Sequence, residues 1–564
     1  MTQEEIRQQL PAHLRQFVAV QDYQQRYTEQ DQAVWRLIMK LLGHQLRDSA
    51  HAVYFDGLKR TGISVEKIPT IDEMNLCLAR LGWRAIVVDG FIPPQAFMEL
   101  QSLKVLAIAL DMRSPQHILY TPAPDIIHEA AGHAPIIADV EYSVYLERFG
   151  EVGMRALYNR YDIELYEAVR KLSIVKERFP VESKEVQEAE QTLLELTDNP
   201  GEPSELALLT RLHWWTVEYG LVGTPEDYKI FGAGLLSSLL EAESCLDDDK
   251  VHKLPLTIDA IKQSYDITNQ QPQLYVTKSC RHLSQILDEF AATMCYSTGG
   301  TQSLEAAAKS EVVTTARLSS GLTISGKFKQ PHKNVIDEVI YFGTEGPTQI
   351  SLNRKELEGH GINHHAQGFG SPVGRICNLL KPLEQATEYE LQEAGIRRDE
   401  FVNLEFLSGI TVSGHLSSIS KHHATILLMT FKDCTVLSPT GEVLFDPAWG
   451  IYDMAVGDTI TSVYSGSGDP FQFDVYPTAS AVQNPTTVHH DDAFSLLAKN
   501  PSLDTIEYLL ASDADNWLLH IEMLNHLNSK TEAYKSIQDR LNQFASHEPL
   551  VKSYLEASRS TALV

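Results

Sequence analysis

The sequence predicts a multi-domain protein with a mainly α-helical first half, a β-rich region and a C-terminal helical tail. Before residue 300, apolar residues lie three and four positions apart over long segments, such as residues 33–46 and 142–160. After the turn signal at residues 297–300, short alternating strands dominate, and amphipathic spacing returns from about residue 491. At roughly 150 residues per domain, a chain of 564 residues predicts about three or four domains.

The helices of the first half follow from their local patterns. Residues 182–196 are rich in Glu and predict a helix with one solvated face, ended by the turn signal Asp198-Asn-Pro-Gly201. The next predicted helix covers residues 206–220 and carries Trp214 and Trp215. Only short strand-like stretches occur between residues 84 and 110. We therefore assign residues 1–300 to one mainly α-helical domain.

The β-rich region contains two similar segments. Strands are predicted at residues 312–318, 322–328, 335–342 and 424–431. The segment Leu-Ser-Ser-Gly-Leu-Thr-Ile-Ser-Gly-Lys-Phe at 318–328 resembles Leu-Ser-Gly-Ile-Thr-Val-Ser-Gly-His-Leu at 407–416. This predicts an internal repeat within residues 311–480, with units at about 311–375 and 400–480, separated by a charged helix at about 379–397. The helical tail is expected over residues 490–564.

Composition excludes several classes of partner and compartment. The formal net charge is −28, and this acidic excess argues against binding to nucleic acid or to anionic membranes. Six cysteines without a C-x-x-C pair predict reduced thiols. The start MTQEEIRQQL has no apolar signal region, and no apolar run approaches the roughly 18 residues of a membrane helix. We therefore expect a cytoplasmic protein.

Two histidines in the stretch Pro124-Asp-Ile-Ile-His-Glu-Ala-Ala-Gly-His-Ala-Pro135 are candidate metal ligands. His128 and His133 are five residues apart, whereas the zinc-protease pattern H-E-x-x-H places its histidines four apart on one helical face. A spacing of five turns the two side chains about 140° apart on a continuous α-helix. Both histidines are therefore expected to reach one metal only if the helix ends between them, at Gly132 and Pro135.

Glu218 is the candidate third ligand. It lies in Leu212-His-Trp-Trp-Thr-Val-Glu-Tyr-Gly220, an aromatic and apolar helix where a carboxylate is costly unless it is paired or coordinated. Two histidines and one carboxylate on one face of a metal leave three positions open, as in non-heme Fe(II) oxygenases. The residues alone leave a second interpretation open, in which a buried histidine pair forms hydrogen bonds and a nearby Arg holds Glu218.

Three further motifs follow along the chain. They are Trp214-Trp-Thr-Val-Glu-Tyr-Gly-Leu221, Phe231-Gly-Ala-Gly-Leu-Leu-Ser-Ser238 and Gln271-Pro272. Together with the histidine motif they span about residues 80–295 and resemble the signatures of the pterin-dependent aromatic amino acid hydroxylases. The resemblance implies a mainly α catalytic domain of that type. It also implies Fe(II), a tetrahydropterin (tetrahydrobiopterin or a relative) and O2 as co-substrate.

The resemblance assigns roles at the iron and the pterin. It implies that Fe(II) is bound by His128, His133 and Glu218. The pterin is expected to contact Ile92, Phe97, Glu129 and His213, with Phe97 stacking on its ring and Glu129 positioning it. The candidate catalytic residues are Glu129, His213 and Trp214. His213 stands where animal members of the family commonly carry Tyr, and it adds a titratable group near the pterin and iron.

The resemblance also places the amino acid substrate. Arg113 is expected to form a salt bridge to the substrate carboxylate, because a guanidinium offers a two-pronged fork of donors. Hydrogen bonds to the substrate backbone are expected from Thr121 and Ser237. The slot for the aromatic ring is expected to be walled by Pro124, Trp214 and Gly234.

The pocket residues favour phenylalanine as substrate and tyrosine as product. Trp214 resembles the phenylalanine- and tyrosine-hydroxylating branches, whereas tryptophan-specific members tend to carry Phe. Ile267 stands where phenylalanine enzymes carry an aliphatic residue and tyrosine enzymes carry Asp. An aliphatic wall would leave a phenolic hydroxyl unpaired, at a cost of about 1–3 kcal/mol. Tryptophan hydroxylation stays open as an alternative.

Two other classes of function compete with this interpretation. One is a zinc or iron hydrolase that uses the same histidine pair with Glu129 as general base. The other is a non-catalytic binding module whose C-terminal half carries the biological role. We expect no regulatory module ahead of the core, no heptad-type tetramerisation helix, and a homo-oligomer, if one forms, through the C-terminal half. The histidines of that half are expected to be exposed loop residues: His360, His364, His365, His422, His423, His489 and His490.

Overall fold

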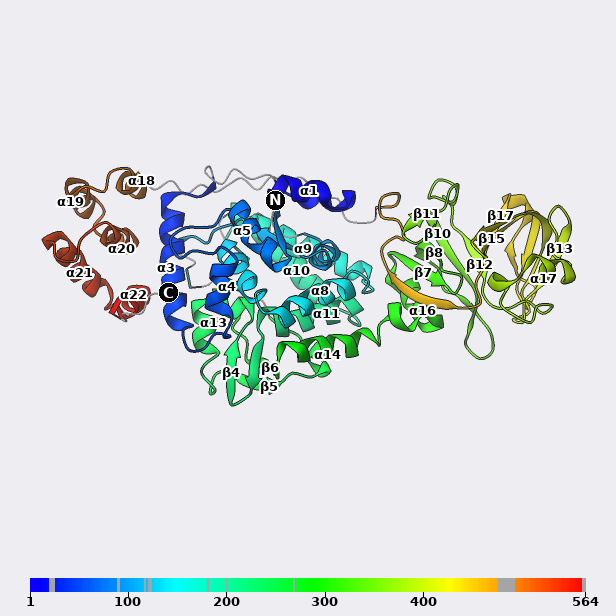
Figure 1. The fold of residues 1–564 in the computed structure, drawn as a ribbon, viewed down its shortest axis with the longest axis horizontal. Coiled ribbons are helices and arrows are strands. Elements are labelled where there is room, and N and C mark those ends of the chain that lie inside the picture. Colours follow the sequence, from blue (N-terminus) through cyan, green and yellow to red (C-terminus); the bar gives the residue numbers. More distant parts are fainter. Residues whose placement is uncertain are drawn as a thin grey trace.

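The computed structural model describes residues 1–19, 26–88, 92–115, 118–119, 124–179, 182–198, 200–266, 269–474 and 492–559. Its elements form three groups along one long axis (Figure 1). The mainly helical part is in the middle, the β-rich part is at one end, and the C-terminal helices are at the other end. The chain therefore runs from the middle to the β-rich end and returns to the opposite side of the helical part.

The middle part holds helices of 3 to 19 residues, most of them around one apolar core that includes the fully buried side chains of Trp35, Trp83 and Trp215. The first helix, at residues 3–9, packs in a smaller cluster, and the helices at residues 295–310 pack against the β-rich part. Several helices begin at a side chain that caps the first turn, such as Thr28 and Thr70. The α-helices are α1 (Gln3–Gln9), α3 (Glu29–Gln45), α4 (Tyr54–Arg60), α5 (Ile71–Leu78), α6 (Pro94–Ser102), α7 (Ala134–Ile136), α8 (Val140–Gly153), α9 (Arg160–Arg178), α10 (Lys184–Thr197), α11 (Glu205–His213), α12 (Ala233–Ser237), α13 (Leu239–Ser244), α14 (Cys280–Ala291), α15 (Cys295–Thr298) and α16 (Gly300–Ser310).

Two small sheets accompany these helices. Strands β1 (Arg84–Val88) and β2 (Val105–Ala109) pair in parallel and are connected through α6. A four-stranded sheet has the order β4-β3-β6-β5, with strands β3 (Leu221–Thr224), β4 (Asp227–Ile230), β5 (His252–Pro255) and β6 (Gln273–Thr277). Strand β2 leads into the segment of Arg113, and β3 closely follows the helical turn that carries Glu218.

Residues 142–160, which have helical spacing throughout, are not one helix in the structure: they cover most of α8, a non-helical link and the first residue of α9. Helix α8 ends at Gly153, and α9 begins after Asn159, whose side chain accepts a hydrogen bond from the backbone N–H of Asp162. The apolar spacing continued across a break that this cap residue imposes, because an Asn side chain satisfies the free N–H groups of a new first turn. The helix expected at 206–220 is α11 followed by a π-helical turn.

The β-rich part consists of two antiparallel sheets. The first has seven strands: β11-β10-β8-β7-β18 in order, with β9 and β12 both paired to β10. The second has five: β13-β14-β15-β16 in order, with β17 paired to β15. The strands are β7 (Val313–Leu318), β8 (Leu322–Phe328), β9 (His332–Lys333), β10 (Val339–Leu352), β11 (Lys355–Glu356), β12 (Gly370–Pro372), β13 (Phe401–Glu405), β14 (Thr411–His422), β15 (Thr425–Leu437), β16 (Val443–Phe445), β17 (Tyr452–Ala455) and β18 (Ile460–Ser465).

The two similar sequence segments have similar local structure. Each forms a turn with a glycine in the left-handed region, Gly321 at φ 87° and Gly409 at φ 86°, and each turn leads into a strand, β8 or β14. The charged helix expected at 379–397 is only α17 (Glu388–Glu393). It begins at Thr387 and stops before Gly395, which also has a positive φ, so turn residues on both sides shorten it.

The C-terminal helices return to the middle part and pack on α3. They are α18 (Asp492–Lys499), α19 (Leu503–Ser512), α20 (Trp517–Asn525), α21 (Glu532–Phe544) and α22 (Pro549–Arg559). Their apolar faces join the same core as α3, and Arg36 forms an ion pair of 2.7 Å with Glu522. None of the helices in the described ranges is both long and apolar enough to span a bilayer.

Candidate iron and substrate site

The two proposed ligand motifs both lie on π-helical turns. The first turn covers His128–His133 and continues into α7, and the second covers Trp214–Glu218 directly after α11. In the first turn the backbone N–H of Ala134 donates to the carbonyl of Glu129, five residues earlier. This i→i+5 pattern widens the helix, so residues five apart lie on one face. The expectation that the helix ends at Gly132 was therefore wrong, and the wider turn brings His128 and His133 together.

Three ligand atoms converge at this point. The Nε2 atoms of His128 and His133 are 3.0 Å apart, and each lies 3.3 Å from a carboxylate oxygen of Glu218. Ligand atoms about 2.1 Å from one ion and at right angles to one another would be about 3.0 Å apart. The observed spacing therefore fits one face of an octahedral ion.

The electrostatics of the cluster suit a cation. Burial alone would raise the pKa of Glu218, but His133 and His128 hold it well below its usual range. Burial opposes protonation of His128, yet Glu218 and two neighbouring carboxylates raise the pKa of His128 to about 9. Burial lowers the pKa of His213 to about 4, so this third imidazole is neutral. The cluster therefore offers an ionised carboxylate beside imidazole nitrogens.

Ser237 fixes the orientation of His128. Its hydroxyl donates to the carbonyl of Ala233 at 2.7 Å, and its oxygen lies 3.0 Å from Nδ1 of His128. Because a serine hydroxyl has one hydrogen, Nδ1 of His128 is the donor in the second contact. Nε2 then faces Glu218 and is the nitrogen that would bind a metal ion, which would displace the proton that the raised pKa of His128 favours there.

Arg113 forms a buried, two-pronged ion pair with Asp125. Its Nε and Nη2 donate to the two carboxylate oxygens at 2.7 and 2.9 Å, and both side chains are 2% exposed. Asp125 also accepts from the backbone N–H of His128, and Nη1 of Arg113 donates to the carbonyl of Ser237 at 3.2 Å. The guanidinium fork expected to face the substrate thus engages Asp125, and the pair ties the Arg113 segment to the helix of His128 and to α12.

Glycines allow α12 to approach both ligand-bearing turns. A Cβ on Gly132 would lie 2.7 Å from the carbonyl oxygen of Ala233, and a Cβ on Gly232 would lie 2.5 Å from that of Glu218. A Cβ on Gly234 would meet the ring of Tyr219 at 2.9 Å. These contacts are closer than any side chain tolerates. Gly234 therefore has a packing role in addition to the substrate-wall role expected for it.

Trp214 belongs to an aromatic cluster next to the ligands. Its ring stacks on Tyr219 with centroids 4.7 Å apart and on Tyr265 with centroids 4.3 Å apart, and its Nε1 donates to the side chain of Gln271 at 3.3 Å. Stacking of this kind restricts the indole to one orientation. Tyr265 was not identified from the sequence, since a single Tyr in a loop carries no distinctive pattern.

Two of the expected pterin residues, Phe97 and His213, contact each other close to Glu218. The ring of Phe97 meets His213 edge-on, with centroids 6.0 Å apart, and Nδ1 of His213 is 3.7 Å from Glu218. In the described part of the chain, Nε2 of His213 is buried without a hydrogen-bond partner. Ile92 is half-buried beside the same region, and burial raises the pKa of Glu129.

The expected residues are not all described by the structure. Thr121 and Ile267 lie outside the described residues, and Pro124 is half-buried at the start of a described segment. Asp125 was missed as a functional residue, although it stands inside the quoted histidine motif. Its position one turn before His128, the spacing of a helix-capping residue, was the available signal.

The middle part of the chain matches one known protein family. Residues 10–164 and 196–308 match the family model of the biopterin-dependent aromatic amino acid hydroxylases. The match starts at residue 10, well before the expected residue 80, so it includes most of the N-terminal helices. The unmatched residues between the two segments fall on α9 and α10, which form a helical pair on this unit.

Several curated relatives are similar over this part. Phenylalanine-4-hydroxylase of Pseudomonas aeruginosa is 28% identical over 264 residues, covering 47% of this chain and 84% of its own length. The enzyme of Chromobacterium violaceum is 26% identical over 260 residues, covering 46% and 73%. A structure of the latter with bound iron (III) and 7,8-dihydrobiopterin aligns at 23% identity and a TM-score of 0.40, covering 52% of this chain and 91% of that one.

Proposed function

Because this chain carries a biopterin-dependent aromatic amino acid hydroxylase domain, we propose that it converts L-phenylalanine to L-tyrosine. The observation that supports this most directly is the convergence of His128, His133 and Glu218 within the matched segments. The named relatives are phenylalanine-4-hydroxylases, which favours phenylalanine over tryptophan. Trp214, which belongs to the expected substrate slot, also favours it.

The donor set fits iron. Two imidazole nitrogens and one carboxylate on one face of the ion leave three positions for other ligands. Their spacing of 3.0 to 3.3 Å matches this geometry. His213 and Phe97 are among the residues expected to contact the pterin, and the buried Nε2 of His213, which has no hydrogen-bond partner in the described residues, together with the half-buried ring of Phe97, supports that role. Iron, O2 and a reduced pterin together supply the oxidising power for an aromatic ring, which no side chain has.

The chain's own residues position the reactants. Ser237 accepts from Nδ1 of His128, which leaves Nε2 as the nitrogen that would bind the ion. Arg113 uses Nε and one Nη2 hydrogen on Asp125, and Nη1 donates to the carbonyls of Ser237 at 3.2 Å and of Ile118 at a longer 3.5 Å. A substrate carboxylate would therefore take the second Nη2 hydrogen and displace the long Nη1 contact with Ile118. The carboxylate and the stacked Trp214 together would aim one ring carbon at the ion.

Product formation from phenylalanine tests this proposal. The full-length protein is supplied with Fe(II), a tetrahydropterin and O2, and tyrosine is measured by mass spectrometry, with tryptophan as a parallel substrate. We expect tyrosine that depends on both iron and pterin. Hydroxylation of tryptophan alone would overturn phenylalanine as the substrate, and tyrosine formed without pterin would favour another class of iron-dependent oxygenase. No product from either amino acid, with iron bound, would favour the hydrolase or the non-catalytic module.

We further propose the division expected from the sequence: a catalytic domain at 1–300, a β-rich region at 311–480 with repeat units at about 311–375 and 400–480, and a helical tail at 490–564. The matching turns at Gly321 and Gly409 support the repeat. We also propose that a homo-oligomer, if one forms, forms through the C-terminal half. The cytoplasmic location stays a prediction.

A further inference from the structure

Three histidines and one aspartate converge between the two sheets of the β-rich part. His360, His364 and His365 lie in the segment between β11 and β12, and Asp453 lies on β17. One ligand atom from each residue lies within 4.8 Å of those of all the others. The expectation that these histidines are exposed was wrong for two of them, because His365 is buried and His360 is half-buried. His489 and His490 lie outside the described residues.

Backbone hydrogen bonds fix the histidine segment. The backbone N–H of Ile350 on β10 donates to the carbonyl of His360 at 2.9 Å, and that of Thr348 donates to the carbonyl of His365 at 3.1 Å. The N–H groups of His364 and His365 both donate to the carbonyl of Gly361. The imidazoles are therefore attached to a strand of the first sheet, whereas Asp453 belongs to the second sheet.

The distances fit a shared ion. Nε2 of His364 is 3.0 Å from Oδ2 of Asp453, Nδ1 of His360 is 3.7 Å from the same oxygen, and Nδ1 of His360 is 3.3 Å from Nε2 of His365. Ligand atoms about 2.1 Å from one ion would be about 3.0 Å apart at right angles and about 3.4 Å apart at tetrahedral angles. The three distances lie near these two values, and the remaining pairs of ligand atoms are no more than 4.8 Å apart.

Hydrogen bonds alone account poorly for the cluster. The contact of His364 with Asp453 is a good hydrogen bond, but the 3.7 Å between His360 and Asp453 is too long for one. His360 and His365 face each other nitrogen to nitrogen, so at least one of these atoms carries no hydrogen. A cation between the imidazoles would satisfy all of these lone pairs together.

A neighbouring side chain orients the aspartate. The Thr430 hydroxyl donates to Oδ1 of Asp453 at 2.8 Å, which leaves Oδ2 directed at His360 and His364. Metal-binding carboxylates commonly have such an outer partner. With one carboxylate and three imidazoles, the donors suit Zn²⁺, Fe²⁺, Co²⁺ or Ni²⁺ and not Mg²⁺ or Ca²⁺, which prefer oxygen ligands.

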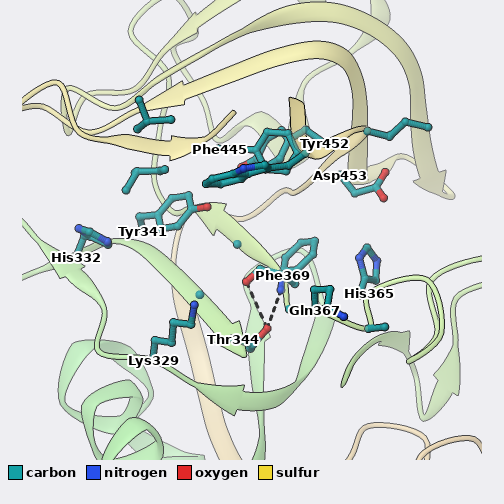
Figure 2. A pocket seen from close by; sticks show the side chains of 18 of the residues that line it. Lys329, His332, Tyr341, Thr344, His365, Gln367, Phe369, Phe445, Tyr452 and Asp453 are labelled. Atoms are coloured by element: carbon teal, nitrogen blue, oxygen red, sulfur yellow. Dashed lines mark hydrogen bonds between the residues drawn. The ribbon is translucent and has the colours of Figure 1, made fainter. Parts of the chain in front are cut away.

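We propose that His360, His364, His365 and Asp453 form a second site, for a divalent transition-metal ion, at the junction of the two β-sheets. His365 and Asp453 lie next to each other at one end of a pocket (Figure 2). The volume of this cavity is about 690 Å³. Three of the four ligands line this cavity: His364, His365 and Asp453. Its wall also includes Lys329 and the aromatic rings of Tyr341, Phe445, Trp449 and Tyr452. With five or six ligands in total, an ion held by these four side chains has a coordination position that a small molecule in the cavity can reach, whereas tetrahedral geometry closes the site.

Metal stoichiometry of the full-length protein tests this site. The protein is stripped with a chelator and titrated with Co²⁺, with bound metal measured by mass spectrometry and the sites followed by visible absorption. We expect two tight equivalents in the wild type, one of which disappears in Glu218→Ala. The His360→Ala/His365→Ala variant is expected to lose the other equivalent and to keep the one that depends on Glu218.

Two further variants serve as controls. The first tests whether exposed histidines bind the metal, and the second tests the site without removing any ligand. His422→Ala/His423→Ala removes two exposed histidines from the β14–β15 turn and is expected to keep both equivalents. Thr430→Val leaves all four ligands in place and is expected to weaken the second equivalent roughly 10–100-fold. One equivalent in the wild type, or two in the His360→Ala/His365→Ala variant, would overturn the proposal.

Discussion

Replacing Asp125 by Asn would leave the buried guanidinium of Arg113 without a counter-charge. The substitution keeps the shape of the side chain, but its amide group can present only one oxygen to Nε and Nη2 of Arg113, which now bond to two. Burial alone would raise the pKa of Asp125, but Arg113 holds that pKa below its usual range, so the native pair is ionised. Each partner is 2% exposed, and water cannot replace the lost carboxylate.

The expected loss of stability is therefore large. Removing one partner of a buried ion pair costs about 3–5 kcal/mol, because a buried charge remains uncompensated. Asp111 provides a matched control, because its ion pair with Arg26 is more exposed, at 36% and 20%. An exposed pair contributes only about 0–1 kcal/mol, so Asp111→Asn is expected to change stability little.

Urea unfolding of the two variants, followed by tryptophan fluorescence, measures this difference. Adding Arg113→Met to Asp125→Asn is expected to restore part of the loss, because no buried cation remains and the oxygen of the introduced amide can still accept from the backbone N–H of His128. The reasoning is refuted if Asp125→Asn costs no more than Asp111→Asn, or if the double variant is no more stable than the single one.

Three more predictions concern the same part of the chain. Glu218→Ala should abolish iron binding and retain the far-UV circular dichroism spectrum, and iron retained at wild-type stoichiometry would remove Glu218 from the ligand set. Burial raises the pKa of Glu241 to about 7, above its unfolded value, so its contribution to stability is present below about pH 4.5 and is lost as the pH rises through 7. Glu241→Gln should therefore gain stability on the order of 3 kcal/mol at pH 8, measured by urea unfolding, and an unchanged pH profile would contradict this. Gly132→Ala should cost about 1–3 kcal/mol and weaken iron binding, because α12 must move away from His128, whereas Gly343→Ala, whose Cβ would lie 3.6 Å from its nearest neighbour, should bind iron normally.

Helix geometry explains the main error at the active site. The spacing of His128 and His133 contradicts a shared metal on an α-helix, so the sequence argument required the helix to end. A π-helical turn removes the contradiction, and its stability depends on tertiary contacts such as those of Gly132 with α12. Periodicity in one sequence cannot reveal a local change of helix type, because the same residues are compatible with both.

In the β-rich part, too, local patterns predicted secondary structure but not the candidate site. Its strands followed from alternation at residues 313–318 and 322–328, but its histidine cluster did not follow from spacing. Asp453 is 89 residues from His364, and only the packing of the two sheets against each other brings Oδ2 of Asp453 to 3.0 Å from Nε2 of His364. A ligand set divided between a loop and a distant strand leaves no motif in the sequence.

The sequence by itself determined the order of the helical and β-rich parts, the family of the catalytic domain and the candidate iron ligands, because periodicity and local motifs are properties of neighbouring residues. Only the tertiary structure decided how those ligands converge, that Asp125 engages the fork of Arg113, and that the tail packs on α3. These features depend on contacts between residues far apart in the chain, whose free energies arise only when burial removes water from the charged and apolar groups that meet.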